Sequence, residues 1–361
     1  MFNLKKILFI VNSLGQGGAE RVVVNLANEM VKVHDVSIIT MYDEKVYELN
    51  QAITFHTLGF SGQKMDKIFK LGKLRKQLST LLSELEKTAP FDLITVHLPF
   101  AELVAQNSHF SDRCHFVVHD VHARRIKENS TLSMVKMTSY VKAFYKGKRI
   151  VTVSSGVKAD FEDLFEVEAK SIINLPNPID LALINEKKQE PLDVDYEYIL
   201  GIGRFVDWKR FDLLIRSFAE SKFAKNGKLV LIGDGPEKNN LTRLAQELGL
   251  VDKVVFAGWQ DNPYQWMQHA TCMVVTSKDE NFAMTMIETL ACNTKVLSVY
   301  SKYGPRDILK DELAEFLIKD ATPAKIAFYI DEKLGNYPTD ISQYVTACDI
   351  KNVTASYLAL K

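Results

Sequence analysis

The sequence has few cysteines, no long apolar run and no excess of charge of either sign, and each absence argues against a class of protein. Four cysteines in 361 residues, none in a Cys-x-x-Cys spacing, disfavour a zinc site and a disulfide scaffold and are typical of reduced thiols. Lysine plus arginine and aspartate plus glutamate number 45 each, so the chain lacks the cationic excess of a general nucleic-acid binder.

Segments that would carry the chain into or across a membrane are also lacking. No window approaches the roughly 20 apolar residues that span a bilayer. The apolar stretch 7–11 is shorter than a signal-peptide core of roughly 7–15 residues, and a glycine turn follows it instead of a cleavage site. We therefore expect a cytoplasmic protein whose contact with a membrane, at its inner face, would be peripheral.

The length and composition predict two globular domains. The chain exceeds the roughly 250–300 residues at which one core stops growing, and its 47% apolar and 25% charged residues are ordinary for a soluble protein. Two prolines and a polar stretch interrupt the pattern between 174 and 195. We place the first domain at 1–184 and the start of the second at 192.

Both halves alternate short β-branched runs with helix-length segments, the pattern of βαβ units in a parallel sheet. The strands predicted in the first half are 6–11, 35–40, 93–97, 116–119 and 150–154; those in the second half are 196–203, 228–233, 253–257, 272–276 and 295–299. The pattern predicts an α/β fold with two doubly wound domains.

Glycines fill the first strand-to-helix turn, at Gly15, Gly17 and Gly18. Such a turn lets the backbone approach a ligand, and the helix N-terminus favours an anion there. Glu20 replaces the third glycine of a dinucleotide fingerprint, and no acid ends the next strand, so an NAD site is disfavoured. A tight turn that serves packing alone is the competing interpretation.

Two cations follow the first strand of the second half. Arg204 and Lys209 lie five residues apart in a βα turn, at the edge of the sheet where open α/β domains bind ligands. Arginine supplies a fork of donors and lysine a point charge, a combination that suits a diphosphate. Solvated surface charge is the alternative for either residue alone.

Two acids, Glu280 and Glu288, lie eight residues apart where another strand leads into an apolar helix. Eight residues are about two helical turns, so both carboxylates can face one crevice and accept hydrogen bonds from sugar hydroxyls. Glu280 could equally be an acid stabilised by the helix dipole. Glu288 lies among apolar residues, where a half-buried acid requires a partner.

His119 ends a predicted strand and is a candidate to point into a ligand crevice. No second cluster of histidine, cysteine or carboxylate with ligand spacing lies near it in sequence, so we predict no metal site. His97 is interpreted as a structural residue.

Together these segments resemble retaining glycosyltransferase family 4, also called the group 1 glycosyltransferases, along nearly the whole chain. The matching segments are Gly17 to Arg21, His119, Asn177 to Asp180, Gly203 and Arg204 with Lys209, Ile232 to Glu237, Phe256 to Gly258, and the pair Glu280 and Glu288. The resemblance implies the GT-B architecture, with two facing Rossmann-like domains. The second, 192–345, would bind the nucleotide-sugar, and a helix at 346–361 would cross back to the first.

The resemblance also implies a role for each residue. Arg204 and Lys209 would hold the diphosphate, and Glu280 and Glu288 would contact the donor sugar and the ribose. Gly18, next to Gly17, would approach the phosphate, and His119 the sugar. Arg204, Lys209, Glu280 and His119 are thus the predicted catalytic residues.

The implied activity is metal-independent transfer of a hexose-type sugar, with retention of configuration and no cofactor. The expected donor is a UDP-sugar and the expected acceptor a glycan or a lipid-linked glycan, in lipopolysaccharide, capsule or other cell-surface polysaccharide synthesis. A nucleotide-sugar epimerase on the same fold and an inert sugar-nucleotide-binding protein are the alternatives.

Three departures from the family pattern concern turns and donor choice. Asn293 stands where a glycine is usual, so we expect it to adopt a positive φ. Phe282-Ala283 replaces a glycine-rich step, and Asp307 stands where glutamate is commoner.

One further segment, 64–85, has leucines at helical spacing and a basic first half. The cations are Lys64, Lys67, Lys70, Lys73, Arg75 and Lys76. This pattern fits a core helix with a solvated basic face, and it also fits a helix held at an anionic membrane surface.

Overall fold

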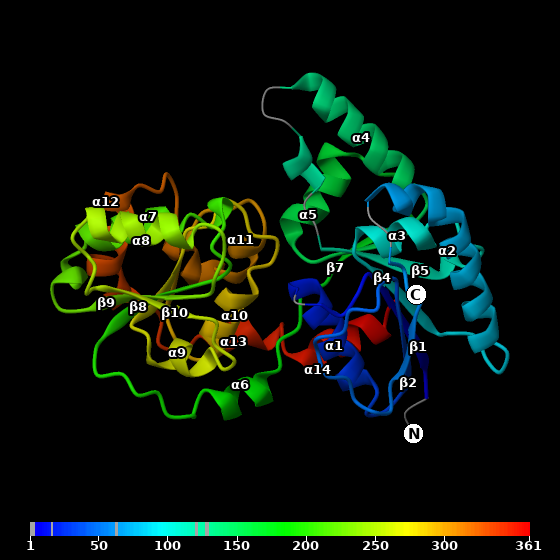
Figure 1. The fold of residues 1–361 in the computed structure, drawn as a ribbon, viewed down its shortest axis with the longest axis horizontal. Coiled ribbons are helices and arrows are strands. Elements are labelled where there is room, and N and C mark those ends of the chain that lie inside the picture. Colours follow the sequence, from blue (N-terminus) through cyan, green and yellow to red (C-terminus); the bar gives the residue numbers. More distant parts are fainter. Residues whose placement is uncertain (1–3, 16, 62–63, 120–121, 127–129) are drawn as a thin grey trace. The chain divides into compact units, whose positions relative to one another are not determined.

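The computed structural model describes residues 4–361 except 16, 62–63, 120–121 and 127–129, and it leaves the side chains of 64–69 and 124–125 undescribed. The chain forms two compact units (Figure 1). Unit 1 is Met1–Pro178 with Ile350–Lys361, and unit 2 is Ile179–Asp349. The division falls in the proline-rich segment, before residue 184 where the sequence pattern put the end of the first domain.

Unit 1 contains a parallel sheet of seven strands in the order β3-β2-β1-β4-β5-β6-β7. The strands are β1 Lys6–Val11, β2 Asp35–Thr40, β3 Thr54–Thr57, β4 Leu93–His97, β5 Cys114–Val118, β6 Arg149–Thr152 and β7 Ser171–Asn174. The central strands are buried apolar runs, as both faces of such a sheet are covered. The two edge strands, β3 and β7, were not predicted, because they are short and partly exposed and have little apolar signal.

The helices of unit 1 lie between and around these strands. They are α1 Gly18–Met30, α2 Lys64–Leu85, α3 Pro99–Ala105, α4 Thr131–Tyr145, α5 Ser155–Ala159 and α14 Ile350–Leu358, with short turns at Ser111–Arg113, His122–Arg125 and Asp160–Leu164. α14 packs against α1 with Val353 and Tyr357 buried, and Lys5 Nζ donates to the carbonyl of Leu358 at 2.5 Å. The predicted helix 346–361 is therefore shorter than expected and begins at Ile350.

Unit 2 contains a parallel sheet of six strands in the order β10-β9-β8-β11-β12-β13. The strands are β8 Tyr198–Ile202, β9 Lys228–Ile232, β10 Val254–Gly258, β11 Cys272–Val275, β12 Val296–Val299 and β13 Leu317–Ile318. The helices are α6 Leu181–Lys187, α7 Phe211–Glu220, α8 Lys238–Glu247, α9 Tyr264–His269, α10 Met284–Ala291, α11 Gly304–Ile308, α12 Pro323–Phe328 and α13 Ser342–Thr346. Short turns occupy Asp207–Lys209, Lys222–Lys225, Asp311–Phe316, Tyr329–Lys333 and Leu334–Asn336.

The two sheets share one topology, which confirms the predicted pair of Rossmann-like domains. In each, the first strand of the unit lies between its second and fourth strands, so the strand order reverses beside it. Ligands of open α/β sheets bind outside the carboxyl ends of the strands at this switch point. In unit 2 it lies between β8 and β11.

The four cysteines are buried and form no disulfide. Burial raises the pKa of each thiol to about 12, so they remain protonated structural side chains. In the described part of the chain, no helix combines the length and the apolar character needed to cross a bilayer.

Candidate active site

The loops after β8 and β9 contact each other directly through glycine. Gly203 has φ 150° and Gly233 has φ 132°, a region that favours glycine. The amide of Gly203 donates to the carbonyl of Ile232 at 3.0 Å, and a Cβ on Gly233 would overlap the carbonyl oxygen of Gly203. These glycines let the two loops pack backbone against backbone at the carboxyl edge of the sheet.

The two predicted diphosphate ligands stand in the loop after β8 but differ in their surroundings. Arg204 is exposed, and its guanidinium has no hydrogen-bond or ion-pair partner among the residues that the structure describes. Lys209 ends the turn Asp207–Lys209, its stem lies over Gly203, and its Nζ forms an ion pair with Glu280. One cation is thus available to an anion and the other is already paired.

Residues just after β11 hold this turn in place. The hydroxyl of Thr276 donates to the carbonyls of Lys209 and Arg210, at 3.0 and 2.9 Å. The amide of Lys278 donates to the carbonyl of Trp208 at 2.8 Å. The contacts exist because β8 and β11 are neighbours in the sheet.

Glu280 lies in the loop after β11, and its side chain is 13% exposed. Its Oε1 accepts a hydrogen bond from Ser277 Oγ at 2.6 Å as well as the contact with Lys209. The amide of Gly304, in the segment after β12, donates to the Glu280 carbonyl at 3.1 Å. Because α10 begins only at Met284, Glu280 lies outside its first turn, and the helix-dipole alternative does not describe it.

Glu288 lies inside α10 and is 4% exposed. The hydroxyl of Tyr264, at the start of α9, is 3.5 Å from Glu288 Oε1, the long end of the range for a hydrogen bond. Burial in an apolar helix with a tyrosine nearby agrees with the expectation that this acid needs a polar partner.

The predicted glycine turn of unit 1 precedes α1. Gly17 caps the helix in an extended conformation, and the carboxylate of Glu20 occupies the space where a Cβ of Gly17 would be. A Cβ on Gly18 would have no neighbour within 4 Å, so this backbone is open to a ligand. Burial raises the pKa of Glu20, and the nearby Glu44 carboxylate adds to the effect.

His119 follows β5 and belongs to a chain of polar side chains. His97 Nδ1 and His119 Nε2 are 3.0 Å apart, and His97 Nε2 is 2.9 Å from Thr95 Oγ1. Removal from water lowers the pKa of His119 to about 4 and that of His97 well below its usual value, which the neighbouring ring depresses further. Both imidazoles are uncharged at neutral pH, and His97 is the structural residue that the sequence indicated.

The structure brings Arg204, Lys209 and Glu280 to one edge of unit 2, and it places Gly17, Gly18 and His119 in unit 1. Sequence reasoning missed Thr276, Ser277, Tyr264 and Thr95, which support these residues. Isolated serine, threonine and tyrosine residues give no local signal, since their role comes from neighbours distant in sequence. In the described ranges, no group of three histidine, cysteine or acidic side chains could hold a metal ion.

Comparisons with known proteins agree with this architecture. Residues 16–183 match the model "Glycosyltransferase Family 4", and residues 184–346 match "Glycosyl transferases group 1". Among solved structures, Anabaena HepE in complex with UDP-glucose superimposes with a TM-score of 0.73 at 17% identity, over 98% of each chain, and so shares the fold.

Two relatives align in sequence. The N-acetylgalactosamine-N,N'-diacetylbacillosaminyl-diphospho-undecaprenol 4-alpha-N-acetylgalactosaminyltransferase of Campylobacter jejuni is 30% identical over 319 residues, 88% of this chain and 86% of the relative. The lipopolysaccharide core biosynthesis glycosyltransferase LpsE of Rhizobium meliloti is 31% identical over 163 residues, 45% of this chain and 46% of the relative. Two family models that together span residues 16–346, with a relative aligned over most of both chains, show that the chain belongs to the group 1 glycosyltransferases of glycosyltransferase family 4 and is a glycosyltransferase.

Proposed function

We propose that this glycosyltransferase takes a UDP-sugar as donor and transfers the sugar, with retention of configuration and without a metal ion, to a lipid-linked or lipopolysaccharide glycan. The observation that carries the proposal is the group Arg204, Lys209 and Glu280 at the switch point of unit 2, where two cations and one acid stand within two adjacent loops.

In this proposal Arg204 and Lys209 bind the donor diphosphate. Arg204 offers an exposed guanidinium, which can contact two phosphate oxygens at once. Lys209 has three N–H donors, of which the Glu280 pair uses one, so others remain for phosphate. Positive charge fixed at the leaving group stabilises the charge that develops as the glycosidic bond breaks, the task that a metal ion performs in other transferases.

The two acids bind hydroxyl groups of the donor. Both contacts of Glu280 within the described chain fall on Oε1, so the lone pairs of Oε2 can accept from the sugar. Glu288, a buried carboxylate beside Tyr264, accepts from the ribose hydroxyls.

Unit 1 contributes neutral groups. His119, held uncharged by burial and in contact with His97, exchanges a hydrogen bond with a sugar hydroxyl. The open backbone at Gly18, next to Gly17, approaches the phosphate at the N-terminus of α1.

The names of the relatives support the choice of acceptor. The Campylobacter jejuni enzyme is named for a sugar linked through diphosphate to undecaprenol, and LpsE for lipopolysaccharide core synthesis. An acceptor of either class is anchored in a membrane, so we propose that the enzyme works at the cytoplasmic face of that membrane.

A donor screen tests the proposal. The purified chain is incubated with UDP-, GDP- and ADP-sugars and a glycan-diphosphate-prenol acceptor, with and without EDTA, and the released nucleoside diphosphate is measured. We expect release from a UDP-sugar only, unchanged by EDTA, and an α-linked product from an α-linked donor by NMR. Release from GDP- or ADP-sugars would contradict the choice of a UDP-sugar as donor. Loss of turnover in EDTA would contradict transfer without a metal ion, and a β-linked product would contradict retention of configuration.

A further inference from the structure

Two polar side chains inside unit 1 support His119. Thr95 and His97 lie two residues apart on β4, so their side chains share one face of the strand, and both are fully buried. His97 Nε2 is 2.9 Å from Thr95 Oγ1, and His97 Nδ1 is 3.0 Å from His119 Nε2. Because β4 pairs with β5, and His119 directly follows β5, the three side chains form a chain that leads from the core to the end of β5.

The two imidazoles share one well-aligned hydrogen bond. Their ring planes are tilted by only 27°, and their centres are 5.3 Å apart, close to the N···N distance plus the two ring radii. The bond therefore lies near the plane of each ring, where the N–H bond and the lone pair of an imidazole point. Two protonated nitrogens at this distance would repel each other, so a single proton lies between the rings. Burial, which lowers the pKa of both rings, keeps them uncharged at neutral pH.

Two arrangements of protons satisfy this geometry. In the first, Thr95 Oγ1 donates to His97 Nε2 and His97 Nδ1 donates to His119 Nε2, so the proton of His119 is on Nδ1. In the second, each bond is reversed and His119 Nδ1 is bare. A neutral imidazole has one N–H, so the tautomer of His97 determines that of His119.

The hydroxyl of Thr95 distinguishes the two arrangements. In the part of the chain that the structure describes, His97 Nε2 is the only hydrogen-bond partner of this hydroxyl, and Thr95 is 0% exposed. In the second arrangement the hydroxyl proton would have no acceptor. A buried donor without an acceptor is costly, whereas an oxygen with an unused lone pair is tolerated more readily. The first arrangement is therefore favoured.

We infer that Thr95 and His97 are positioning residues that hold His119 as the Nδ1–H tautomer, so that His119 donates a hydrogen bond from Nδ1 to an oxygen of the donor sugar. Thr95 and His97 act through His119, because the hydrogen bond at one ring nitrogen determines what the other nitrogen presents. A donor that is oriented before the sugar binds requires no reorganisation during transfer. The contact with the sugar rests on the proposed function, whereas the tautomer is a property of unit 1 alone.

Nuclear magnetic resonance measures the tautomer directly. Two-bond ¹H–¹⁵N spectra of the full chain at pH 7 distinguish a protonated ring nitrogen from a bare one, and the variant His119→Asn identifies the signals of His119 by their absence. We expect a protonated Nδ1 and a bare Nε2 on His119. A bare Nδ1 or a doubly protonated ring would overturn the inference, and no substrate is needed for this result.

Matched variants of Thr95 test the effect on transfer. Thr95→Val keeps the branched shape but removes the hydroxyl proton, so the tautomer of His119 is no longer fixed, whereas Thr95→Ser keeps the hydroxyl. We expect kcat/KM for the UDP-sugar to fall about tenfold in Thr95→Val, the effect of one lost hydrogen bond, and to stay within about threefold in Thr95→Ser. The Kd of UDP, which has no sugar, should change in neither variant.

Variants of His97 separate the two nitrogens of its ring. His97→Asn places an amide near the position of Nδ1 and can still donate to His119, whereas His97→Gln places the amide near Nε2 and reaches only Thr95. We expect kcat/KM to be about tenfold higher in His97→Asn than in His97→Gln. Equal activity of the two variants would contradict a role through His119, because a role in packing alone does not favour the asparagine.

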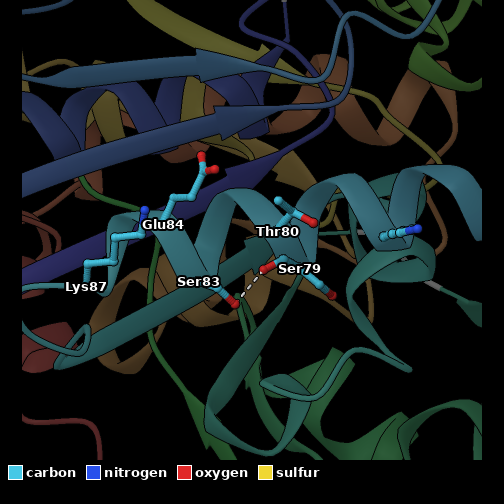
Figure 2. Close-up of a pocket in the computed structure, with 6 residues that line it drawn as sticks. Ser79, Thr80, Ser83, Glu84 and Lys87 are labelled. Carbon is cyan, nitrogen blue, oxygen red and sulfur yellow. Dashed lines mark hydrogen bonds between the residues drawn. The ribbon is translucent and has the colours of Figure 1, made fainter.

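Helix α2 provides a control for the substitution of threonine by valine. Its Leu74, Leu78 and Leu82 are buried. A shallow pocket of about 400 Å³ lies along its surface (Figure 2), lined by Lys76, Ser79, Thr80, Ser83, Glu84 and Lys87. The described part of α2 is thus the core helix with a solvated face, one of the two interpretations that its sequence allowed. Thr80 is exposed on this face, so Thr80→Val should leave kcat/KM and the tautomer of His119 unchanged.

Circular dichroism and thermal melting establish that each variant is folded. Normal kcat/KM in Thr95→Val, or an equal loss of kcat/KM and of UDP affinity, would overturn the positioning role. If the donor screen rejects a UDP-sugar, the kinetic comparison is made with the donor that the screen identifies. The tautomer of His119 is measured without any donor, so failure of the donor assignment and failure of this inference are distinguishable.

Discussion

The two cations after β8 are not equivalent as single residues. Arg204 is exposed and has no partner in the described chain, whereas Lys209 is paired with Glu280 and only 20% exposed. Removing Arg204 takes away one charge. Removing Lys209 also leaves a largely buried carboxylate without its cation, and such a carboxylate is costly.

We predict that Arg204→Ala and Lys209→Ala each lower kcat/KM by 100-fold or more, on the order of 3 kcal/mol of transition-state stabilisation. Lys209→Ala combined with Glu280→Gln should cost much less than the product of the two single effects, since the pair acts as a unit. Initial rates of nucleotide release are measured for the unchanged chain, Arg204→Ala, Lys209→Ala, Glu280→Gln and the double variant. Lys225→Ala, an exposed lysine before β9, should be neutral.

Near-normal turnover in Arg204→Ala or Lys209→Ala would reject the diphosphate role of that residue. Strict multiplicativity of the Lys209 and Glu280 effects would show that the ion pair has no part in catalysis.

At the scale of elements, α10 is bounded by two residues with positive φ that are not glycine. Asn293, just after the helix, has φ 61°, which confirms the expectation from its sequence position. Ala283, which caps the helix at its start, has φ 58°. In the sequence, Phe282-Ala283 replaces a glycine-rich step of the family. The sequence did not predict that Ala283 would adopt the left-handed backbone that a glycine adopts easily.

This strain predicts a stability effect. Left-handed backbone costs an alanine about 1–2 kcal/mol, and glycine loses roughly 0.5–1 kcal/mol more chain entropy on folding, so Ala283→Gly should raise the free energy of unfolding by up to about 1 kcal/mol. Asn293→Gly should change it less, because asparagine tolerates this region.

Denaturant unfolding of the variants measures the effect. Ala291→Gly, at the last residue of α10, serves as the opposite control and should destabilise by up to about 1 kcal/mol. A destabilised Ala283→Gly variant would mean that the lost methyl group, in a residue 8% exposed, outweighs the relief of strain.

The edge strands show where sequence patterns fail at this scale. The strands predicted from the sequence match observed strands within a few residues, because their apolar runs are strong. β3, β7 and β13 were missed, since they have only four, four and two residues and complete a sheet that already exists. Their formation depends on a neighbour that offers unpaired backbone groups.

At the scale of the whole molecule, the two units differ in their buried histidines. Four histidines of the described chain have a lowered pKa, and all lie in unit 1: His34, His97, His115 and His119. In each, burial is the main cause. These rings stay uncharged in folded unit 1 at a pH where the unfolded chain, with histidine pKa near 6.5, already binds protons.

We therefore predict that acid weakens unit 1 before unit 2. The histidine contribution to stability is complete above about pH 6.5 and is lost as the pH falls toward about 4, the pKa of His119. Glu20, whose pKa is raised, acts in the opposite direction.

Hydrogen exchange at pH 7 and pH 5, corrected for intrinsic rates, should show a larger loss of protection in β1, β4 and β5 than in β8, β9 and β11. The variant His119→Asn, which keeps a polar partner for His97, should reduce the difference. An equal change in both units would contradict the assignment of neutral buried histidines.

The sequence by itself determined the α/β class, the two domains with their proline-rich boundary, and the identity of the charged residues at strand ends. These features are local, because each depends on residues that lie within about ten positions of one another in the chain. They are the apolar periodicity, the turn residues and the step from strand to loop. The family resemblance added the expected role of each residue, and the matches over 16–346 then established the family.

Only the tertiary structure decided which of these residues meet. Lys209 and Glu280 are 71 residues apart, and they pair because β8 and β11 are neighbours in the sheet, an order that the succession of strands along the chain does not encode. The same holds for α2, whose sequence fits both a core helix and a helix at a membrane surface. Burial of its Leu74, Leu78 and Leu82 follows from how the helix packs on unit 1, because what a side chain faces depends on neighbours that the chain brings in from elsewhere.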